Sequence, residues 1–259
     1  MSNLLVFNVK TVPNIELGKK IYNLSNLDDD DVSKVMFFKQ RQDNKTDLLP
    51  LSLLKIVAIS VVIKTTDKIN IISLGKNDRD EKNMVQQFFD EVERYQPKLI
   101  SWNGKVFDIP ILYIRAINYF IQAKYFWQKD ATNILNYNGI LDKDDESHID
   151  LIDILPTSQL TSRVSLNHYA SLLGAPCTQE SNVINNWSAY LAGDDNKIKN
   201  DCDIDCIRTY IVFLRLQHFW GYLSDQQLVE SNNQLKDSLG KLSTAHLLKF
   251  LEGWNFNPE

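Results

Sequence analysis

Two β-branched segments, residues 56–63 and 69–74, constrain the fold most, because only the five polar residues 64–68 separate them. Isoleucine and valine dominate both segments, as they do in buried strands. Two strands joined by so short a polar link typically pair as an antiparallel hairpin. The sequence therefore predicts a β-hairpin over residues 56–74.

Segments on either side of the hairpin extend this pattern into a mixed sheet. The opening run Leu4–Val9 predicts a buried strand, and residues 99–102 and 148–152 predict two more. Apolar residues recur at helical spacing in residues 83–95 and 109–120, so helices are expected between these strands. This order, with three antiparallel strands followed by alternating helices and strands, predicts an α/β fold.

The remaining segments are predicted to be an insertion and a helical extension. Residues 16–50 are mostly polar and are interpreted as an insertion that carries one short helix. Its four aspartates, Asp28–Asp31, are expected to form a solvated loop or a helix start in preference to a metal site. Residues 125–147 look irregular. Further helices are expected around residues 166–173, about 201–222 and about 225–251.

Composition favours one domain over residues 1–259, with an insertion at about 16–50 and a helical extension at about 225–259. The chain carries a formal charge of -5 and a pI near 5.4. Proteins that hold the phosphate backbone non-specifically usually have a basic face, so the charge argues against a protein that coats duplexes. The net negative charge is compatible with an enzyme that admits one strand end into an acidic cleft, where metal ions supply positive charge.

The cysteines and the opening residues bear on the compartment. Cys177, Cys202 and Cys206 are odd in number and lack a secreted disulfide spacing, which fits a reducing compartment. Two thiols without nearby histidines make a poor zinc site, so Cys202 and Cys206 are expected in the core or at an interface. The opening residues do not resemble a signal peptide, and no apolar run approaches roughly 18 residues. A soluble cytoplasmic protein without a membrane partner is expected.

The segment FNVKTVPN, residues 7–14, ends the first expected strand. It resembles F-D-I-E-T-V-P, the first exonuclease motif of predicted 3′-5′ exonucleases related to the proofreading domain of family B DNA polymerases. In that motif an aspartate and a glutamate two residues apart leave the same face of a strand and ligate the same pair of divalent ions. Asn8 and Lys10 occupy those two positions here.

The segment SWNGKVFDIPIL, residues 101–112, resembles the second motif of that family, W-N-G-x-x-F-D-x-P. The resemblance implies that Asp108 is a metal-site aspartate at the start of a helix. It also implies that Trp102, Asn103 and Phe107 contact the terminal nucleotide. Taken alone, the segment fits equally well an Asn-Gly turn followed by an aspartate that caps a helix.

The segment DCDIDCIRTYIVFLR, residues 201–215, resembles the third motif, Y-C-E-x-D-V-x-x-T-Y-x-x-x-x-R. The resemblance implies that Asp205 is a metal-binding aspartate. It places Asp201 where the family has the tyrosine that orients the attacking water, so the aromatic hydroxyl is lost. Positions four apart share one helix face, so these two residues can serve one site.

Two shorter fragments complete the resemblance. HIDLIDIL, residues 148–155, resembles an H-x-D-L stretch, and RVSLNHYASLLGAP, residues 163–176, resembles K-x-S-L-x-x-x-A-x-x-L-G-x-P. All the matches follow in the family's order, from residue 4 to about residue 221. They imply a DEDD-type exonuclease fold, in which a ribonuclease-H-like mixed sheet is flanked by helices. His148 and His168 could act as general bases, but their apolar surroundings favour packed or surface histidines.

The replacements in the first motif weaken the expected metal site. Asn8 removes one negative charge and Lys10 exchanges a negative charge for a positive one, a change of three charge units. Two unit charges at about 4 Å interact by about 4 kcal/mol at an effective dielectric near 20, and a divalent ion would feel up to about double. A loss of about 3 kcal/mol in binding free energy lowers the affinity for the metal ion more than a hundredfold. Catalysis with Mg²⁺ or Mn²⁺ is therefore expected to be weak or absent.

Three functional hypotheses follow. In the preferred one, the Lys10 ammonium replaces a metal ion and pairs with Asp108 and Asp205. The domain has then lost most or all catalysis and binds single-stranded DNA, a 3′ end or a protein partner. In the second, Lys10 extends to solvent, and Asp108, Asp205 and Asp201 hold one ion in an active metal-dependent 3′-5′ DNA exonuclease. In the third, residues 16–50 and the C-terminal helix form a protein-interaction surface, which an exposed apolar patch would support.

Overall fold

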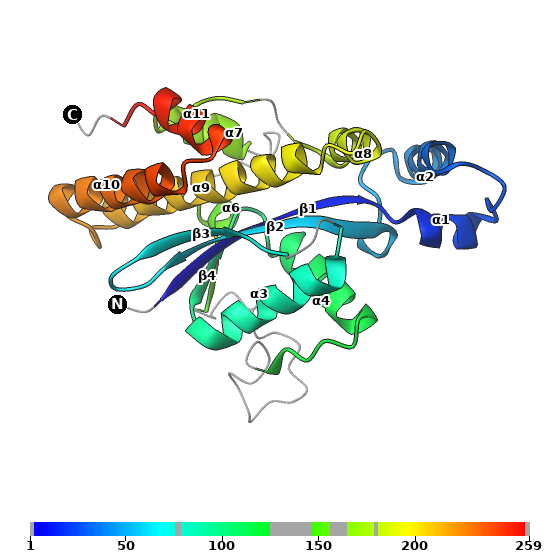
Figure 1. Cartoon of the computed structure of the whole chain (residues 1–259), viewed down its shortest axis with the longest axis horizontal. Helices are drawn as coiled ribbons and strands as arrows, with labels where there is room; N and C mark the ends of the chain where they lie inside the picture. Colours follow the sequence, from blue (N-terminus) through cyan, green and yellow to red (C-terminus); the bar gives the residue numbers. More distant parts are fainter. Residues whose placement is uncertain (1–2, 76–78, 125–146, 156–164, 179–180, 257–259) are drawn as a thin grey trace.

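The computed structural model describes residues 3–75, 79–124, 147–155, 165–178 and 181–256. Within these ranges, helices cover both faces of a five-stranded sheet (Figure 1). The long helix α9, Asp195–Phe219, crosses one face, and α3, Glu81–Tyr95, and α4, Asp108–Asn118, cover the other. The expected α/β architecture is confirmed.

The sheet mixes antiparallel and parallel strands in the order β3-β2-β1-β4-β5. Pairing is antiparallel between β1 and β2 and between β2 and β3, and parallel between β1 and β4 and between β4 and β5. This topology confirms the hairpin and the ribonuclease-H-like mixed sheet. The strands are β1, Leu4–Pro13, β2, Leu54–Lys64, β3, Ile69–Ser73, β4, Lys98–Ser101, and β5, His148–Asp150.

Strand β1 separates two apolar cores because successive side chains of a strand point to opposite faces. Leu5, Phe7 and Val9 belong to the core that contains residues of α3. Val6 belongs to the core that contains residues of α9. The even-numbered positions of β1 from Leu4 to Lys10 therefore face α9, and a register shift after Lys10 ends this alternation.

The polar insertion contains two helices, so the expectation of one short helix was wrong. Helix α1 covers Ile15–Tyr22 and α2 covers Asp29–Asn44. Between them Asn23 adopts a left-handed φ of 56° that ends α1. The side chain of Asp28 accepts a hydrogen bond from the backbone N–H of Asp31 at 2.8 Å. The aspartate run thus starts a helix, as one of the two alternatives predicted.

The second half of the chain departs from prediction mainly at element boundaries. The predicted fifth strand is shorter than residues 148–152, because α6 already begins at Leu151. Helix α9 starts at Asp195 instead of near residue 201, since the Asp194 side chain caps it by accepting from Lys197 N at 3.1 Å. Its second half is buried on most sides.

Several shorter elements complete the description. Helix α7 and the helical tail were predicted, but α8 was not. The tail is divided into α10 and α11 at Ser243, which has a left-handed φ of 51°. The irregular segment expected at 125–147 falls almost entirely outside the described residues, as do residues 163–164. The elements are a 3-10 turn, Leu51–Leu53, then α6, Leu151–Ile154, α7, Leu166–Leu172, α8, Val183–Leu191, α10, Asp225–Leu242, and α11, Ala245–Gly253.

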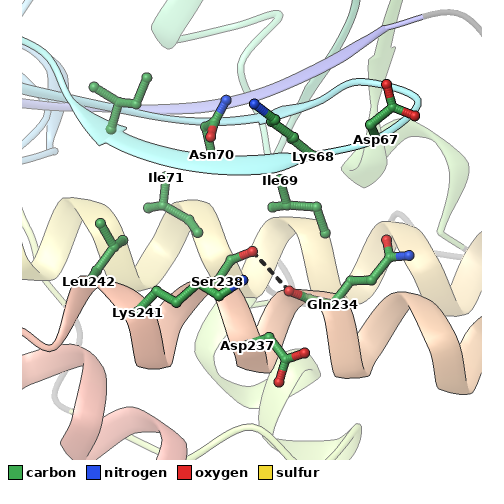
Figure 2. A pocket seen from close by; sticks show the side chains of 11 residues that line it. Asp67, Lys68, Ile69, Asn70, Ile71, Gln234, Asp237, Ser238, Lys241 and Leu242 are labelled. Carbon is green, nitrogen blue, oxygen red and sulfur yellow. Dashed lines mark hydrogen bonds between the residues drawn. The ribbon is translucent and has the colours of Figure 1, made fainter.

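Helix α10 runs along the edge strand β3, and a groove of about 520 Å³ lies between them (Figure 2). Ile69 and Ile71 point from β3 toward α10, whereas Lys68 and Asn70 point away from it (Figure 2).

Among the helices of the described ranges, none combines the length and apolarity that crossing a bilayer requires.

Candidate functional site

Strand β1 presents Asn8 and Lys10 to helix α9. The two residues lie two positions apart, so their side chains leave the same face of the strand. Cys202 of α9 donates a hydrogen bond from Sγ to the backbone carbonyl of Asn8 at 3.2 Å. The Lys10 side chain is buried, with a residue exposure of 7%. It therefore does not extend into solvent, the geometry on which the second hypothesis depended.

The Lys10 ammonium forms an ion pair and hydrogen bond with Oδ2 of Asp205. The other carboxylate oxygen of Asp205 accepts from the guanidinium of Arg208, one turn further along α9, at 3.2 Å. Burial by itself would lower the pKa of Lys10, but the charge and hydrogen bond of Asp205, together with smaller contributions from Cys202 and Asp201, leave this pKa raised. Asp205 is therefore shared between two side chains that both carry positive charge at neutral pH.

Asp108 reaches the same region from the first turn of α4. Its Oδ1 accepts a hydrogen bond from the backbone N–H of Val9 at 2.8 Å. Burial raises the pKa of Asp108 to about 7, although the Val9 hydrogen bond and the charge of Lys10 act in the opposite direction. Lys10 thus pairs directly with Asp205, whereas Asp108 is bound to the main chain beside Lys10.

Asp201 lies one turn before Asp205 on α9 and is more exposed than the other acids of the site. It accepts from the ammonium of Lys197 at 3.1 Å, with 32% of its own side chain exposed. Its charge adds to the upward shift of the pKa of Lys10. The structure therefore gathers all five predicted polar site residues around one face of β1, with Asp201 at the rim.

The Trp102–Phe107 loop is fixed by a residue that was not among the predicted site residues, Asp150. Its two carboxylate oxygens accept from the backbone N–H groups of Asn103, at 2.7 Å, and Lys105, at 2.9 Å. Burial raises the pKa of Asp150, and these hydrogen bonds oppose that shift. The carboxylate holds the loop in a turn in which Asn103 has a left-handed φ of 63°. The H-x-D-L fragment was the sequence signal for this role.

Gly104 is required inside the same loop. A Cβ atom at this position would lie 2.4 Å from Oγ and 2.5 Å from Cβ of Ser101. Ser101 is itself fully buried, and its Oγ lies 2.8 Å from Nε2 of His148 in a hydrogen bond. The absence of a side chain at Gly104 lets the loop approach the end of β4.

The loop also carries two aromatic side chains. Trp102 packs against Tyr169 of α7 with ring centroids 6.0 Å apart. Phe107 is half-buried and precedes the first residue of α4. Both rings are thus anchored on one side and partly accessible on the other.

The cysteines and histidines have structural roles. Cys202 and Cys206 are fully buried and donate to backbone carbonyls of β1, with Cys206 Sγ 3.3 Å from the carbonyl of Val6. Burial raises the pKa of Cys202 to about 12, so its thiol is neutral. His148 is buried beside Ser101, and His168 is exposed. None of these side chains contributes a base or an anionic ligand to the site.

The residues present do not fit a pair of divalent ions. Such ions need several anionic oxygen ligands, but Asn8 supplies an amide and Lys10 an ammonium. Arg208 adds a second cation against Asp205. Across the described ranges, no group of three or more His, Cys, Asp or Glu side chains is arranged to hold a metal ion. The geometry provides charge compensation by protein cations instead.

The sheet order, the helix α9 that crosses it and the three motif segments define an exonuclease-type α/β domain. A family model for predicted 3′-5′ exonucleases related to the exonuclease domain of PolB matches residues 46–254, and the chain belongs to this family. The match includes Asp108, Asp150 and Asp205. It begins after β1, the strand that carries Asn8 and Lys10.

Among solved structures, the chain is similar to the family B DNA polymerase from the hyperthermophilic archaeon Pyrobaculum calidifontis. The TM-score is 0.52 at 12% sequence identity, and the similarity covers 84% of this chain and 24% of the polymerase chain. At that identity the likeness shows the fold alone, and the chain spans about a quarter of the polymerase's length. No curated protein matches the sequence.

Proposed function

We propose that this chain is a non-catalytic exonuclease-like domain that binds the 3′ end of single-stranded DNA. The observation that carries the proposal is the ion pair between Lys10 and Asp205. An ammonium group compensates the charge of an aspartate, but it cannot bind a water molecule as a Lewis acid and lower its pKa. The pair therefore supports a stable fold and argues against hydrolysis.

The charge inventory of the site supports the same conclusion. Lys10 and Arg208 both contact Asp205, and Asn8 is neutral. A divalent ion placed about 4 Å from one of these cations would be repelled by several kcal/mol at an effective dielectric near 20. Two ions would have to displace both cations from the partly buried carboxylate of Asp205. That displacement would leave the ammonium of Lys10 buried without its partner, which is costly.

The loop Trp102–Phe107 supports retention of end binding. Single-stranded nucleic acids bind through bases that stack on aromatic side chains, and each stack contributes about 1–3 kcal/mol. Asp150 holds this loop rigid through Asn103 and Lys105, so the loop would lose little entropy when a nucleotide binds. Because the chain has a net charge of -5, binding is expected to depend on the terminal nucleotide more than on backbone phosphates.

Fluorescence anisotropy with a 5′-labelled single-stranded oligonucleotide tests end binding. In EDTA, an oligonucleotide with a free 3′ hydroxyl should bind at least several-fold more tightly than one whose 3′ end is blocked by a bulky group. Phe107→Ala should weaken binding about tenfold or more through the lost stacking. Phe38→Ala is a matched control, because Phe38 is 57% exposed on α2. Equal binding of free and blocked ends would contradict the proposal.

A time course with Mn²⁺ on the same oligonucleotide tests the absence of catalysis. The parent protein and an Asp205→Ala variant should leave the oligonucleotide equally intact. Stepwise shortening by the parent that disappears in the variant would show an active exonuclease and overturn the proposal.

A further inference from the structure

A second cavity, of about 490 Å³, lies at the end of the sheet where β1 begins. The first residue of β1, the end of β2 and the start of β4 form its floor, and residues of α9 and α10 form the opposite walls. In Figure 1 the N-terminus and the turn between β2 and β3 lie at this same end of the molecule. The volume is typical of sites that hold small organic molecules.

The floor of the cavity carries two lysines in adjacent strands. In the register of the sheet, Leu4 of β1 is paired with Lys64 of β2 on one side and with Lys98 of β4 on the other. Residues paired across strands point to the same face, and all three line the cavity. With strands about 4.8 Å apart, the two lysine backbones are separated by roughly 10 Å, so both flexible side chains can reach one anion.

Neither lysine forms an ion pair with a carboxylate among the described residues. Lys64 donates to the neutral side-chain oxygen of Gln234 at 3.0 Å, and burial lowers its pKa against the opposing charge of Asp67. Lys98 forms no ion pair within the described part of the chain. Glu230, from α10, is the acidic residue of the lining, and its carboxylate accepts from Gln226 at 2.8 Å. In a chain with an excess of acidic residues, two such lysines at one cavity create a local positive potential.

The walls of the cavity are mainly apolar. Phe213 and Leu214 of α9 and Ile149 of β5 contribute apolar surface. Tyr210 of α9 also lines the cavity, and the residue is 1% exposed.

We propose that this cavity binds a small amphipathic anion, whose apolar body contacts Phe213 and Leu214 and whose carboxylate or phosphate head lies between Lys64 and Lys98. The site is separate from the Lys10 site, because six residues of β1 span roughly 20 Å. The groove between β3 and α10 in Figure 2 lacks this selectivity, since the charges of Asp67 and Asp237 balance those of Lys68 and Lys241.

Calorimetric titration with four eight-carbon probes tests the proposal on the full chain. Octanoate and octyl phosphate should both bind saturably, and the tighter of the two identifies the preferred head group. Octylammonium and octanol, which share the apolar body, should bind at least tenfold more weakly. Inorganic phosphate alone should also bind weakly, because it lacks the body. Equal binding of the charged and neutral probes, or of inorganic phosphate and octyl phosphate, would overturn the proposal.

Two lysine variants locate the binding. Lys98→Gln and Lys64→Gln should each weaken the tighter anion at least fivefold, while the thermal unfolding midpoint stays close to that of the parent. Lys68→Gln is the matched control, because Lys68 is exposed and does not line this cavity. Anion binding that is unaffected by Lys98→Gln and Lys64→Gln would place the ligand elsewhere and contradict the assignment.

Discussion

Lys10 and Asp205 form an ion pair although 195 positions separate them in the chain. The pair joins β1 to the helix that crosses the sheet, at the position where related motifs place acidic ligands of divalent ions. The ammonium is buried and its pKa is raised, so its charge is a permanent part of the folded structure. Through this contact a protein cation compensates the negative charge of Asp205.

The energetic coupling of the pair can be measured by a double-mutant cycle. Lys10→Met should lower the free energy of unfolding by about 3 kcal/mol, because Asp205 loses a buried partner. The double variant Lys10→Met/Asp205→Asn should lose less than the sum of the single variants, with a coupling of at least about 1 kcal/mol. Urea unfolding measures each term. Lys34 and Asp30, an exposed pair on α2, serve as the control and should show little coupling. Additive effects at Lys10 and Asp205 would contradict a direct interaction.

Asp108 should make stability depend on pH. Burial raises its pKa from 3.8 to about 7, so between those values the folded state binds the proton more tightly than the unfolded state. Its contribution to stability therefore falls as the pH rises through this window. Asp108→Asn cannot ionise and retains an oxygen for the Val9 N–H. Relative to the parent, this variant should gain about 3 kcal/mol between about pH 5 and about pH 8. Urea midpoints across the range measure the gain, and a constant difference would refute the shift.

Asp150 should act on nucleotide binding by positioning a loop. Asp150→Asn replaces one of two acceptor oxygens with a donor, so one of the N–H groups of Asn103 and Lys105 loses its partner. We expect the affinity for an oligonucleotide 3′ end to fall about tenfold and stability to fall by about 1–3 kcal/mol. Asp90→Asn, an exposed position on α3, should change neither quantity. A stability loss without any change in affinity would restrict Asp150 to a structural role.

Gly104 should tolerate no side chain unless Ser101 is reduced. Gly104→Ala would place its Cβ 2.4 Å from Ser101 Oγ, so we expect a loss of about 1–3 kcal/mol in thermal or urea unfolding. Ser101→Gly/Gly104→Ala removes the clashing atoms and should be more stable than expected from the two single variants. If Gly104→Ala alone matched the parent, the tight approach of the loop to β4 would be wrong.

Sequence patterns predicted the sheet because its strands are marked by β-branched runs and a short polar turn. They failed at the insertion, where α2 is rich in polar residues, and at α8, whose nine residues are too few to show a helical period. The start of α9 was misplaced because its first turn, near Asp195, is entirely polar. Its boundary depends on a side-chain cap from Asp194 that periodicity does not reveal.

In the candidate site, some residues could be predicted from the sequence and others could not. Asn8, Lys10, Asp108 and Asp205 could be named from motif positions, since each motif lies at the end of a strand or on a helix. The pairing of Lys10 with Asp205 was also predicted, whereas the predicted pairing with Asp108 was not found, because Asp108 accepts from the main-chain N–H of Val9. Asp150 was missed although the H-x-D-L fragment contains it, because its function is to accept main-chain N–H groups, which the residue type alone does not reveal.

Titration with Mn²⁺ measures whether Lys10 has taken the place of a metal ion. The parent should show no saturable binding at this site in the micromolar range. Asn8→Asp/Lys10→Glu restores the two acids of the first motif, and its affinity for Mn²⁺ should rise at least a hundredfold, a gain that Asp108→Ala abolishes in the same background. Tight binding of two ions by the parent, lost on Asp205→Ala, would show that Lys10 does not replace a metal ion.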